Sequence, residues 1–321
     1  LYLDAYLVTG KTKYADVATD IIHYVLRDMT HEGGGFYSAE DADSEGHEGK
    51  FYCWTKTGLE KLLTKEEAAV VIRRYGITER GNFTDHSHPE PLKNQNVLSI
   101  VDPKLSDAEK KLLASAKAKM FKERATRIRP HLDDKILSSW NGLMLGALAR
   151  AHSVLGKPEF LKAAEKNLTF IQAKLWDAKT KTLYHRWREG EHDTIQLLHA
   201  YGYQLGGVLE LYETTLNPDH LTFAIELAEG LLKRFHDKAE GGFWTAEGSD
   251  DSIVRLKEER DGAEPAAASV AVVALLKLGA ITEREEFTKA AESTLELYSE
   301  SFVKRPYALP LLLGALDFWL H

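Results

Sequence analysis

Two kinds of helix alternate along this chain, and this pattern constrains the fold more than any other feature. One kind is small and apolar nearly all round, as in SSWNGLMLGALARAHSVLG from Ser138 and AAASVAVVALLKLG from Ala266. The other kind has one apolar stripe, as where Phe160, Ala164 and Leu168 share a face. A helix that is apolar all round is buried on most sides, whereas a striped helix keeps one face in water. The alternation therefore predicts an all-α fold, an (α/α) toroid with short β-hairpins in its loops.

The same hairpin plan recurs at a spacing of roughly 60 residues, as expected of a repeat architecture. We expect inner helices near 138–155, 199–214 and 265–279, and outer helices near 158–175, 219–236 and 283–301. Helix starts are indicated by Asn217-Pro218 and by two capping boxes, Ser106 with Glu109 and Thr282 with Glu285. The loops near 33–54, 183–188 and 242–245 are expected to form short β-hairpins.

One domain is expected over residues 1–321, with an inserted elaboration at about 51–137. That segment breaks the period, and we expect it to lack enough apolar residues for a core of its own. The chain starts with Leu1 inside a predicted helix. We therefore expect a fragment whose toroid is incomplete at the N-terminus and only marginally stable alone.

Composition excludes several classes of function. The net charge of -8 argues against a nucleic-acid partner. Cys53 is the only cysteine, so the chain can form neither an internal disulfide nor a cysteine-based zinc site. No apolar run reaches about 18 residues, so we expect no membrane span. The sequence predicts a cytoplasmic protein with no cofactor and no bound metal.

The stretch GGGFYSAEDADSEGHEGKFYCW, from Gly33 to Trp54, combines acids with aromatic residues. Flat aromatic faces suit the apolar side of a sugar ring, and carboxylates suit its hydroxyls and glycosidic oxygen. We expect Glu40 and Asp43 to be catalytic acids. Asp41, together with the aromatic residues Tyr37 and Trp54, is expected to bind the substrate.

Two other interpretations of this stretch stay open. The acids fit a tight turn that closes a β-hairpin, with side chains accepting from backbone N–H groups. They also resemble the start of a calcium loop, because Asp41, Asp43 and Glu45 precede Gly46. The twelfth position of that loop is Tyr52 where an EF-hand needs Glu, which disfavours calcium.

Further candidates stand at the starts of inner helices. Asp134, Trp140 and Asn141 surround the start of one such helix, and His199 opens another. Asp261 and Glu264 precede a third. Capping and structural hydrogen bonds are the alternative role for each of these residues. Because inner helices of a toroid open their N-termini at one end of the ring, we expect all these groups and the acids of the 33–54 stretch to line one funnel. Asp134, Asp261 and Glu264 are the expected catalytic acids, and Trp140, Asn141 and His199 are expected to bind substrate.

Three blocks in this order resemble the family of spermatogenesis-associated protein 20 and bacterial YyaL. The blocks are the 33–54 stretch, LDDKILSSWNGLM from Leu132 and RDGAEPAAAS from Arg260. The resemblance covers nearly the whole chain. It implies that a thioredoxin-like domain precedes the toroid in the full-length protein. It also implies kinship in fold with N-acylglucosamine 2-epimerases and six-hairpin glycosidases.

This chain departs from the family pattern at two places. His199-Ala200-Tyr201 stands where the family usually has an acidic pair before a tyrosine. Ala266, Ala267 and Ala268 stand where it usually has Ser, Gly or Pro and then Asn. If those family groups are catalytic, this member is altered or inactive.

The sequence thus predicts a carbohydrate-active domain that binds or processes a small-molecule or oligosaccharide ligand. The many acids favour a glycoside hydrolase over an epimerase, because His199 is the one histidine expected at the start of an inner helix, where it could act as a base. The alternative is a non-catalytic module that serves the thioredoxin-like domain, with neither a nucleic acid nor a membrane as partner.

Overall fold

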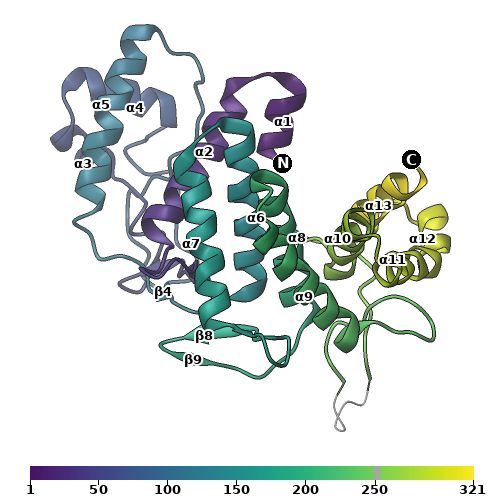
Figure 1. Cartoon of the computed structure of the whole chain (residues 1–321). Helices are drawn as coiled ribbons and strands as arrows, with labels where there is room; N and C mark the ends of the chain where they lie inside the picture. Colours follow the sequence, from purple (N-terminus) through teal and green to yellow (C-terminus); the bar gives the residue numbers. More distant parts are fainter. Residues whose placement is uncertain (249–253) are drawn as a thin grey trace. The chain divides into compact units, whose positions relative to one another are not determined.

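The computed structural model describes residues 1–248 and 254–321, which form two compact units (Figure 1). The first, here called the helical unit, comprises Leu1–Ser38 and Asp134–His321. The second, the 39–133 unit, comprises Ala39–Asp133.

The helical unit consists of inner helices paired with outer helices, as the alternation of helix types predicts. The inner helices are α6 (Ser138–Leu155), α8 (Leu198–Thr215) and α10 (Ala267–Thr282), and the outer ones are α7 (Pro158–Lys174), α9 (Pro218–Phe235) and α11 (Glu285–Leu297). Two further pairs are α1 (Tyr2–Thr9) with α2 (Thr12–Asp28), and α12 (Ser299–Lys304) with α13 (Pro310–Leu320). Helix α8 packs between α6 and α10, while α1 packs on α6 and α13 packs on α10. The prediction of helical hairpins of the (α/α) toroid type is confirmed.

The inner helices approach each other closely because small residues lie between them. A Cβ atom at Gly142 of α6 would lie only 2.5 Å from the backbone nitrogen of Gln204 in α8. Around this contact the apolar side chains are fully buried, as at Leu145, Val208 and Leu275. The spacing of α6 and α8, and with it the geometry where they begin, therefore depends on a missing side chain.

Helix starts follow the sequence signals in two cases out of three. The Asn217 side chain accepts from the backbone of Asp219 at 3.0 Å, and Ser106 with Glu109 forms a full capping box on α5. The capping box predicted from Thr282 and Glu285 is wrong. Helix α10 continues through Thr282, whose hydroxyl donates back to the carbonyl of Leu278. A left-handed residue, Glu283, then ends the helix, and α11 begins with no side-chain cap.

Short strands occupy the loops at the starts of the inner helices. Strands β5 (Ile136–Leu137), β8 (Arg186–Arg188) and β9 (Glu191–His192) form one antiparallel sheet in that order, and β6 (Trp176–Asp177) pairs with β7 (Thr182–Leu183). The loop near 242–245 contributes a single bridge between Phe243 and His236. Residues 249–252, which end the loop motif GGFWTAEGSDDS, lie outside the described residues.

The 39–133 unit has three helices and two short hairpin-like pairings. Its helices are α3 (Lys56–Leu62), α4 (Lys65–Tyr75) and α5 (Asp107–Arg124), and its strands are β1 (Ala39–Glu40) with β4 (Leu132–Asp133) and β2 (Asp43–Ser44) with β3 (His47–Glu48). Leu59, Val71, Ala116 and Met120 lie in a buried apolar cluster shared by the three helices. The expectation that this segment lacks a core of its own is therefore wrong. Across residues 1–248 and 254–321, no helix is both long and apolar enough to cross a membrane.

Candidate functional site

A pocket of 470 Å³ opens where α6, α8 and α10 begin in the helical unit. We call it the helix-start pocket and define it by Trp140, His185, His199, Glu258 and Glu264, all of which line it. The loops are tied to the helix starts by backbone hydrogen bonds, such as the one from Ser138 to the carbonyl of His185 at 2.9 Å. Of the sequence candidates, Trp140, His199 and Glu264 are thus brought together in one pocket.

His199 and Glu258 form the closest polar pair of this pocket. Nε2 of His199 lies 2.9 Å from Oε1 of Glu258. The other oxygen, Oε2, accepts from the backbone N–H of Ala267, the first residue of α10, at 2.7 Å. The hydrogen bond to Glu258 raises the pKa of His199 despite its burial. Burial opposes ionisation of Glu258 most strongly, but the hydrogen bond and charge of His199 and the N–H of Ala267 together outweigh it and leave the pKa of Glu258 lowered. The pair is thus held as an imidazolium and a carboxylate.

His185 lines the same pocket, but its pKa is shifted in the opposite direction to that of His199. Burial lowers its pKa, and the positive charges of Arg186 and His199 add to this effect against the opposing charge of Asp193. Its Nδ1 atom is buried and has no hydrogen-bond partner among the residues that the structure describes. The pocket therefore holds one histidine that favours the charged form and one that favours the neutral form.

Trp140 and Glu264 form the exposed side of the pocket. The indole Nε1 donates to Oε1 of Glu264 at 3.0 Å, while 41% of the Trp140 surface stays exposed. Below them, the buried Tyr203 donates its hydroxyl to the carbonyl of Pro265 at 2.5 Å. Burial, with the charges of Glu264 and Glu258 close by, raises the pKa of Tyr203 and keeps it neutral. The arrangement leaves an aromatic face and a carboxylate open to a ligand.

Asp261 and Asp134 are engaged elsewhere in the helical unit. The carboxylate of Asp261 accepts from the backbone of Ala266 at 2.8 Å and of Leu311 at 2.9 Å, so it joins the starts of α10 and α13. Asp134 lies 2.6 Å from Nε of Arg188 in an ion pair. Neither residue lines the helix-start pocket, and any catalytic role for them stays a prediction.

Asn141 is buried and joins α6 to the glycine-rich loop. Its side chain accepts from the backbone N–H of Phe36 at 2.7 Å and donates to the Phe36 carbonyl at 3.0 Å. Asn167 also donates to it at 2.7 Å. The loop can come this close because Gly35 has no side chain: a Cβ there would lie 2.7 Å from Ile136. Tyr37 follows in the same loop and packs edge-on against His31.

The other sequence candidates belong to the 39–133 unit. Glu40 is bound by Arg129 and accepts from the hydroxyl of Tyr52 at 3.0 Å. Asp41 accepts from the backbone N–H of Asp43 at 3.2 Å, which is the turn-forming role left open by the sequence. Trp54 is buried, only 5% exposed. The single funnel predicted from the sequence draws on both units, and that grouping stays a prediction.

Sequence reasoning missed Glu258 and His185. Glu258 stands nine residues before α10 in an irregular loop, where no periodicity points inward. His185 falls in LYHRW, within one of the loops expected to form a short β-hairpin, but its histidine was not weighed. In the described part of the chain, no group of three or more His, Cys, Asp or Glu side chains is placed to hold a metal ion.

Sequence comparison extends over almost the entire chain. It is 32% identical to human spermatogenesis-associated protein 20 over 351 aligned positions, which cover 98% of this chain. The chain is a relative of spermatogenesis-associated protein 20. The rat protein matches at 32% identity and the mouse protein at 31%, each over 99% of this chain. The chain spans only 45% of the length of these curated relatives. No family model matches it.

Solved structures match less closely. A D-mannose isomerase aligns with 93% of this chain and 73% of its own, at 16% identity and a TM-score of 0.46. A family 76 glycoside hydrolase (mannosidase) from Bacteroides thetaiotaomicron aligns with 91% of this chain and 72% of its own, at 16% identity and a TM-score of 0.44. Structural similarity at this level says nothing about a substrate.

Proposed function

We propose that the helical unit binds a sugar in the helix-start pocket and exchanges protons with it, as in the isomerisation or epimerisation of an aldose. The observation that carries this proposal is the pair of histidines with opposite pKa shifts in one pocket, His199 raised and His185 lowered. Titratable groups whose environments push their pKa values apart are suited to act as acid and base.

The chemistry needs only these two groups and is balanced without a cofactor. Neutral His185 takes the proton from the carbon next to the carbonyl of the open-chain sugar. His199, as imidazolium backed by Glu258, gives a proton to the carbonyl oxygen, so an enediol forms. A proton is then delivered from His185 to carbon 1, which gives the ketose isomer, or to the opposite face of carbon 2 after the enediol turns over in the pocket, which gives the epimer. In either case an enediol hydroxyl returns its proton to His199 as the carbonyl forms again, so both histidines are restored. No electron leaves the substrate, because the carbonyl is reduced as the neighbouring carbon is oxidised.

The remaining groups of the pocket are suited to hold the sugar. The exposed face of Trp140 offers a flat apolar surface for one side of the chain or ring. Glu264 is oriented by the indole N–H and can accept hydrogen bonds from hydroxyl groups. Tyr203 stays neutral beneath them, so it adds no further charge.

Hydrolysis has less support from this pocket. Two of the residues predicted to be catalytic acids have structural partners outside the pocket. Asp134 is paired with Arg188, and Asp261 accepts from two backbone N–H groups. Glu264 is the one predicted catalytic acid that lines the pocket, and its neighbour Glu258 is bound to His199.

Deuterium exchange tests the proposal. The chain is incubated in D₂O with D-glucose, D-mannose and their β-1,4-linked disaccharides, and loss of the proton at carbon 2 is followed by NMR. We expect exchange and the appearance of an isomer with at least one sugar. Replacing an acid–base group lowers such rates by about 10²- to 10⁴-fold, which is the loss expected for His185→Gln and for His199→Gln.

His192→Gln is the matched control, because His192 is exposed, lies outside the helix-start pocket and only stacks on Tyr184. It should exchange as fast as the unaltered chain. Exchange that persists in both pocket variants would overturn the proposal. Release of monosaccharide from the disaccharides without exchange at carbon 2 would show hydrolysis instead.

One observation favours a second candidate, a sugar-binding module without catalysis. Glu258 and Asp261 both hold backbone N–H groups at the start of α10, which is a structural task that needs no substrate. In this case a sugar raises the melting temperature, no proton at carbon 2 exchanges, and Trp140→Ala abolishes the shift.

A further inference from the structure

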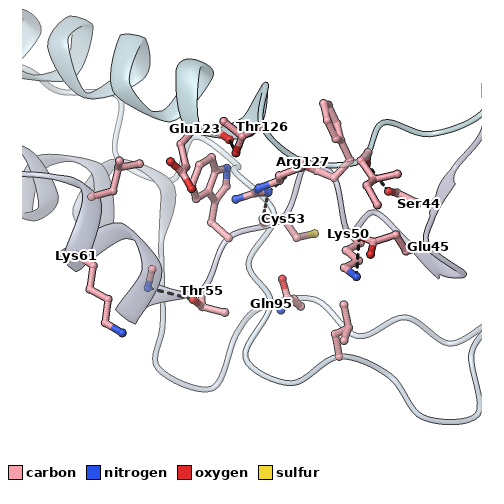
Figure 2. A pocket seen from close by; sticks show the side chains of 16 residues that line it. Ser44, Glu45, Lys50, Cys53, Thr55, Lys61, Gln95, Glu123, Thr126 and Arg127 are labelled. Atoms are coloured by element: carbon pink, nitrogen blue, oxygen red, sulfur yellow. Dashed lines mark hydrogen bonds and ion pairs between the residues drawn. The ribbon is translucent and has the colours of Figure 1, made fainter.

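The 39–133 unit contains a separate pocket of 860 Å³, which no role in sugar chemistry accounts for (Figure 2). One wall is apolar and formed by Phe51, Cys53 and Trp54, all at most 5% exposed. The lining also includes two apolar residues that are less buried: Leu62 is partly exposed and Ile128 is largely exposed. The rest of the lining is mostly polar or charged, so the pocket combines one apolar wall with groups that can bind the polar end of a small organic molecule.

Arg127 is the residue of this pocket best placed to bind a ligand, because its guanidinium is held among the lining residues. Its Nη1 donates to the carbonyls of Phe51 and Cys53, each at 2.8 Å. Its guanidinium carbon lies 3.9 Å from the centre of the Trp54 ring. These contacts fix the guanidinium among the lining residues, where Figure 2 shows it reaching toward Cys53.

The carboxylate of Glu123 acts on the same guanidinium through its charge but is not close enough for an ion pair. No carboxylate of the described residues forms an ion pair with Arg127, and its Nε and Nη2 donate to no described atom. Burial lowers the pKa of Arg127, yet a guanidinium stays charged at any ordinary pH. A partly buried, rigidly held guanidinium with unused donors matches the planar geometry of a carboxylate.

The other charges of the pocket are consistent with an anionic ligand. Lys61 lines the pocket and forms no ion pair within residues 1–248 and 254–321. Lys50 and Glu45 neutralise each other at 2.8 Å. Glu123 is the remaining acid of the lining, and it lies on the exposed surface of α5.

We propose that this pocket binds a small organic anion, a carboxylate carried on a compact apolar body. The carboxylate pairs with the unused nitrogens of Arg127, and Lys61 adds a longer-range attraction. The apolar body covers Leu62 and Ile128 and lies against the wall formed by Phe51.

Isothermal titration calorimetry of the whole chain with benzoate and benzamide tests this directly, because the two probes share a shape and differ in charge. We expect benzoate to bind at least about tenfold more tightly, the value of one charge-assisted hydrogen-bonded pair. Inorganic phosphate, which has charge but no apolar body, should bind more weakly than benzoate. Equal affinity for benzoate and benzamide, or tighter binding of phosphate, would contradict the proposal.

Variants separate a ligand role of Arg127 from its structural role. Arg127→Gln should lower benzoate affinity at least about tenfold. Because Arg127 also ties two loop carbonyls, Lys61→Glu and Glu123→Gln supply tests at exposed positions. The first should weaken benzoate binding about threefold and the second should strengthen it by a similar factor. Lys117→Glu, an equal charge change on α5 outside the pocket, should leave the affinity unchanged. Changes of the same size in Lys117→Glu and Lys61→Glu would overturn the assignment.

Discussion

The helical unit and the 39–133 unit each surround a pocket with acidic side chains, but the acids are used differently. In the helical unit, Glu258 receives hydrogen bonds from an imidazole and from the first N–H of α10. In the 39–133 unit, Glu45 of the pocket lining is paired with Lys50. Glu40 and Asp41 lie outside that lining: Arg129 binds Glu40, and Asp41 closes a turn. The pocket of the first unit therefore presents histidines and carboxylates to a ligand, whereas that of the second presents a guanidinium.

This difference shows that the density of acids along the sequence does not locate a reactive carboxylate. The stretch from Gly33 to Trp54 carries five acids, yet Glu40 and Asp41 have structural partners. The loop before α10 contributes Glu258 and Glu264 because a helix N-terminus attracts negative charge. The position of an acid relative to a helix start is more informative than the number of acids around it.

The largest expected effect comes from a change that forces apart α6 and α8, two of the helices whose starts form the helix-start pocket. Gly142→Ala places a Cβ 2.5 Å from the backbone of Gln204, so α6 and α8 must separate. We expect a loss of about 3 kcal/mol in the free energy of unfolding, measured by urea denaturation. Gly314→Ala in α13 has open space around its Cβ and should instead stabilise by about 1 kcal/mol. Similar effects of the two changes would refute the account of helix spacing.

A smaller loss of stability is expected at Asn141. The sequence predicts that this residue contacts a ligand, whereas the structure places it in a buried hydrogen-bond network. Asn141→Ala leaves the backbone of Phe36 without its partner and removes one of the two hydrogen bonds that the Asn167 amide donates. We expect about 2 kcal/mol of destabilisation. The double variant with Asn167→Ala should lose less than the sum of the two single changes. If Asn141→Ala is as stable as the unaltered chain but no longer binds a sugar, the structural role is wrong and Asn141 contacts the ligand.

The 39–133 unit should lose stability in acid. Hydrogen bonds from Lys119, Ser115 and the Thr64 backbone lower the pKa of Glu67 to about 2. Since its unfolded value is 4.5, this stabilisation is full above that pH and is lost as the pH falls through about 2. Glu67→Gln can keep the cap on α4 through its one amide oxygen, but it removes the charge and the second acceptor oxygen, as protonation also does. Its deficit against the unaltered chain should therefore vanish in acid, and a deficit independent of pH would contradict this.

The stability of the helical unit should also depend on pH, but more weakly, and it should fall as the pH rises. The pKa of His199 is raised, so its pairing with Glu258 stabilises fully below the unfolded value of 6.5 and is lost as the pH rises through the folded value. His199→Gln should be less stable than the unaltered chain at pH 6 and equal to it well above neutrality, as read from urea midpoints. His192→Gln should show no such trend. A growing deficit at high pH would reverse the predicted sign.

Much of the fold could be predicted because buried and half-exposed helices differ in pattern. The bounds of α6 match the prediction, and α8 and α10 differ from it by at most three residues at either end. A local sequence signal gave a wrong prediction where the side chain forms a different hydrogen bond. Thr282 was expected to cap α11, but its hydroxyl donates to the carbonyl of Leu278 in α10. The core of the 39–133 unit was missed because Leu59, Val71 and Ala116 come from three helices whose packing no periodicity reveals.

The candidate site was predictable only in part, for a similar reason. Trp140 and His199 lie at helix starts, and the starts of neighbouring inner helices lie close together, so their shared pocket follows from the fold. Glu258 and His185 come from loops, whose paths depend on contacts such as the hydrogen bond from Ser138 to the His185 carbonyl. A single sequence carries no signal for such a contact.

The central claim is that one pocket holds two histidines with opposite tendencies, and NMR titration of the imidazole groups measures this directly. The signals of His185 and His199 are assigned by their disappearance in His185→Gln and His199→Gln. The account predicts that His199 titrates above the ordinary histidine value of 6.5 and His185 below it. It also predicts that Glu258→Gln moves His199 downward, because the raising partner is lost. Titration of the two histidines at the same pH, or in the reverse order, would contradict the claim.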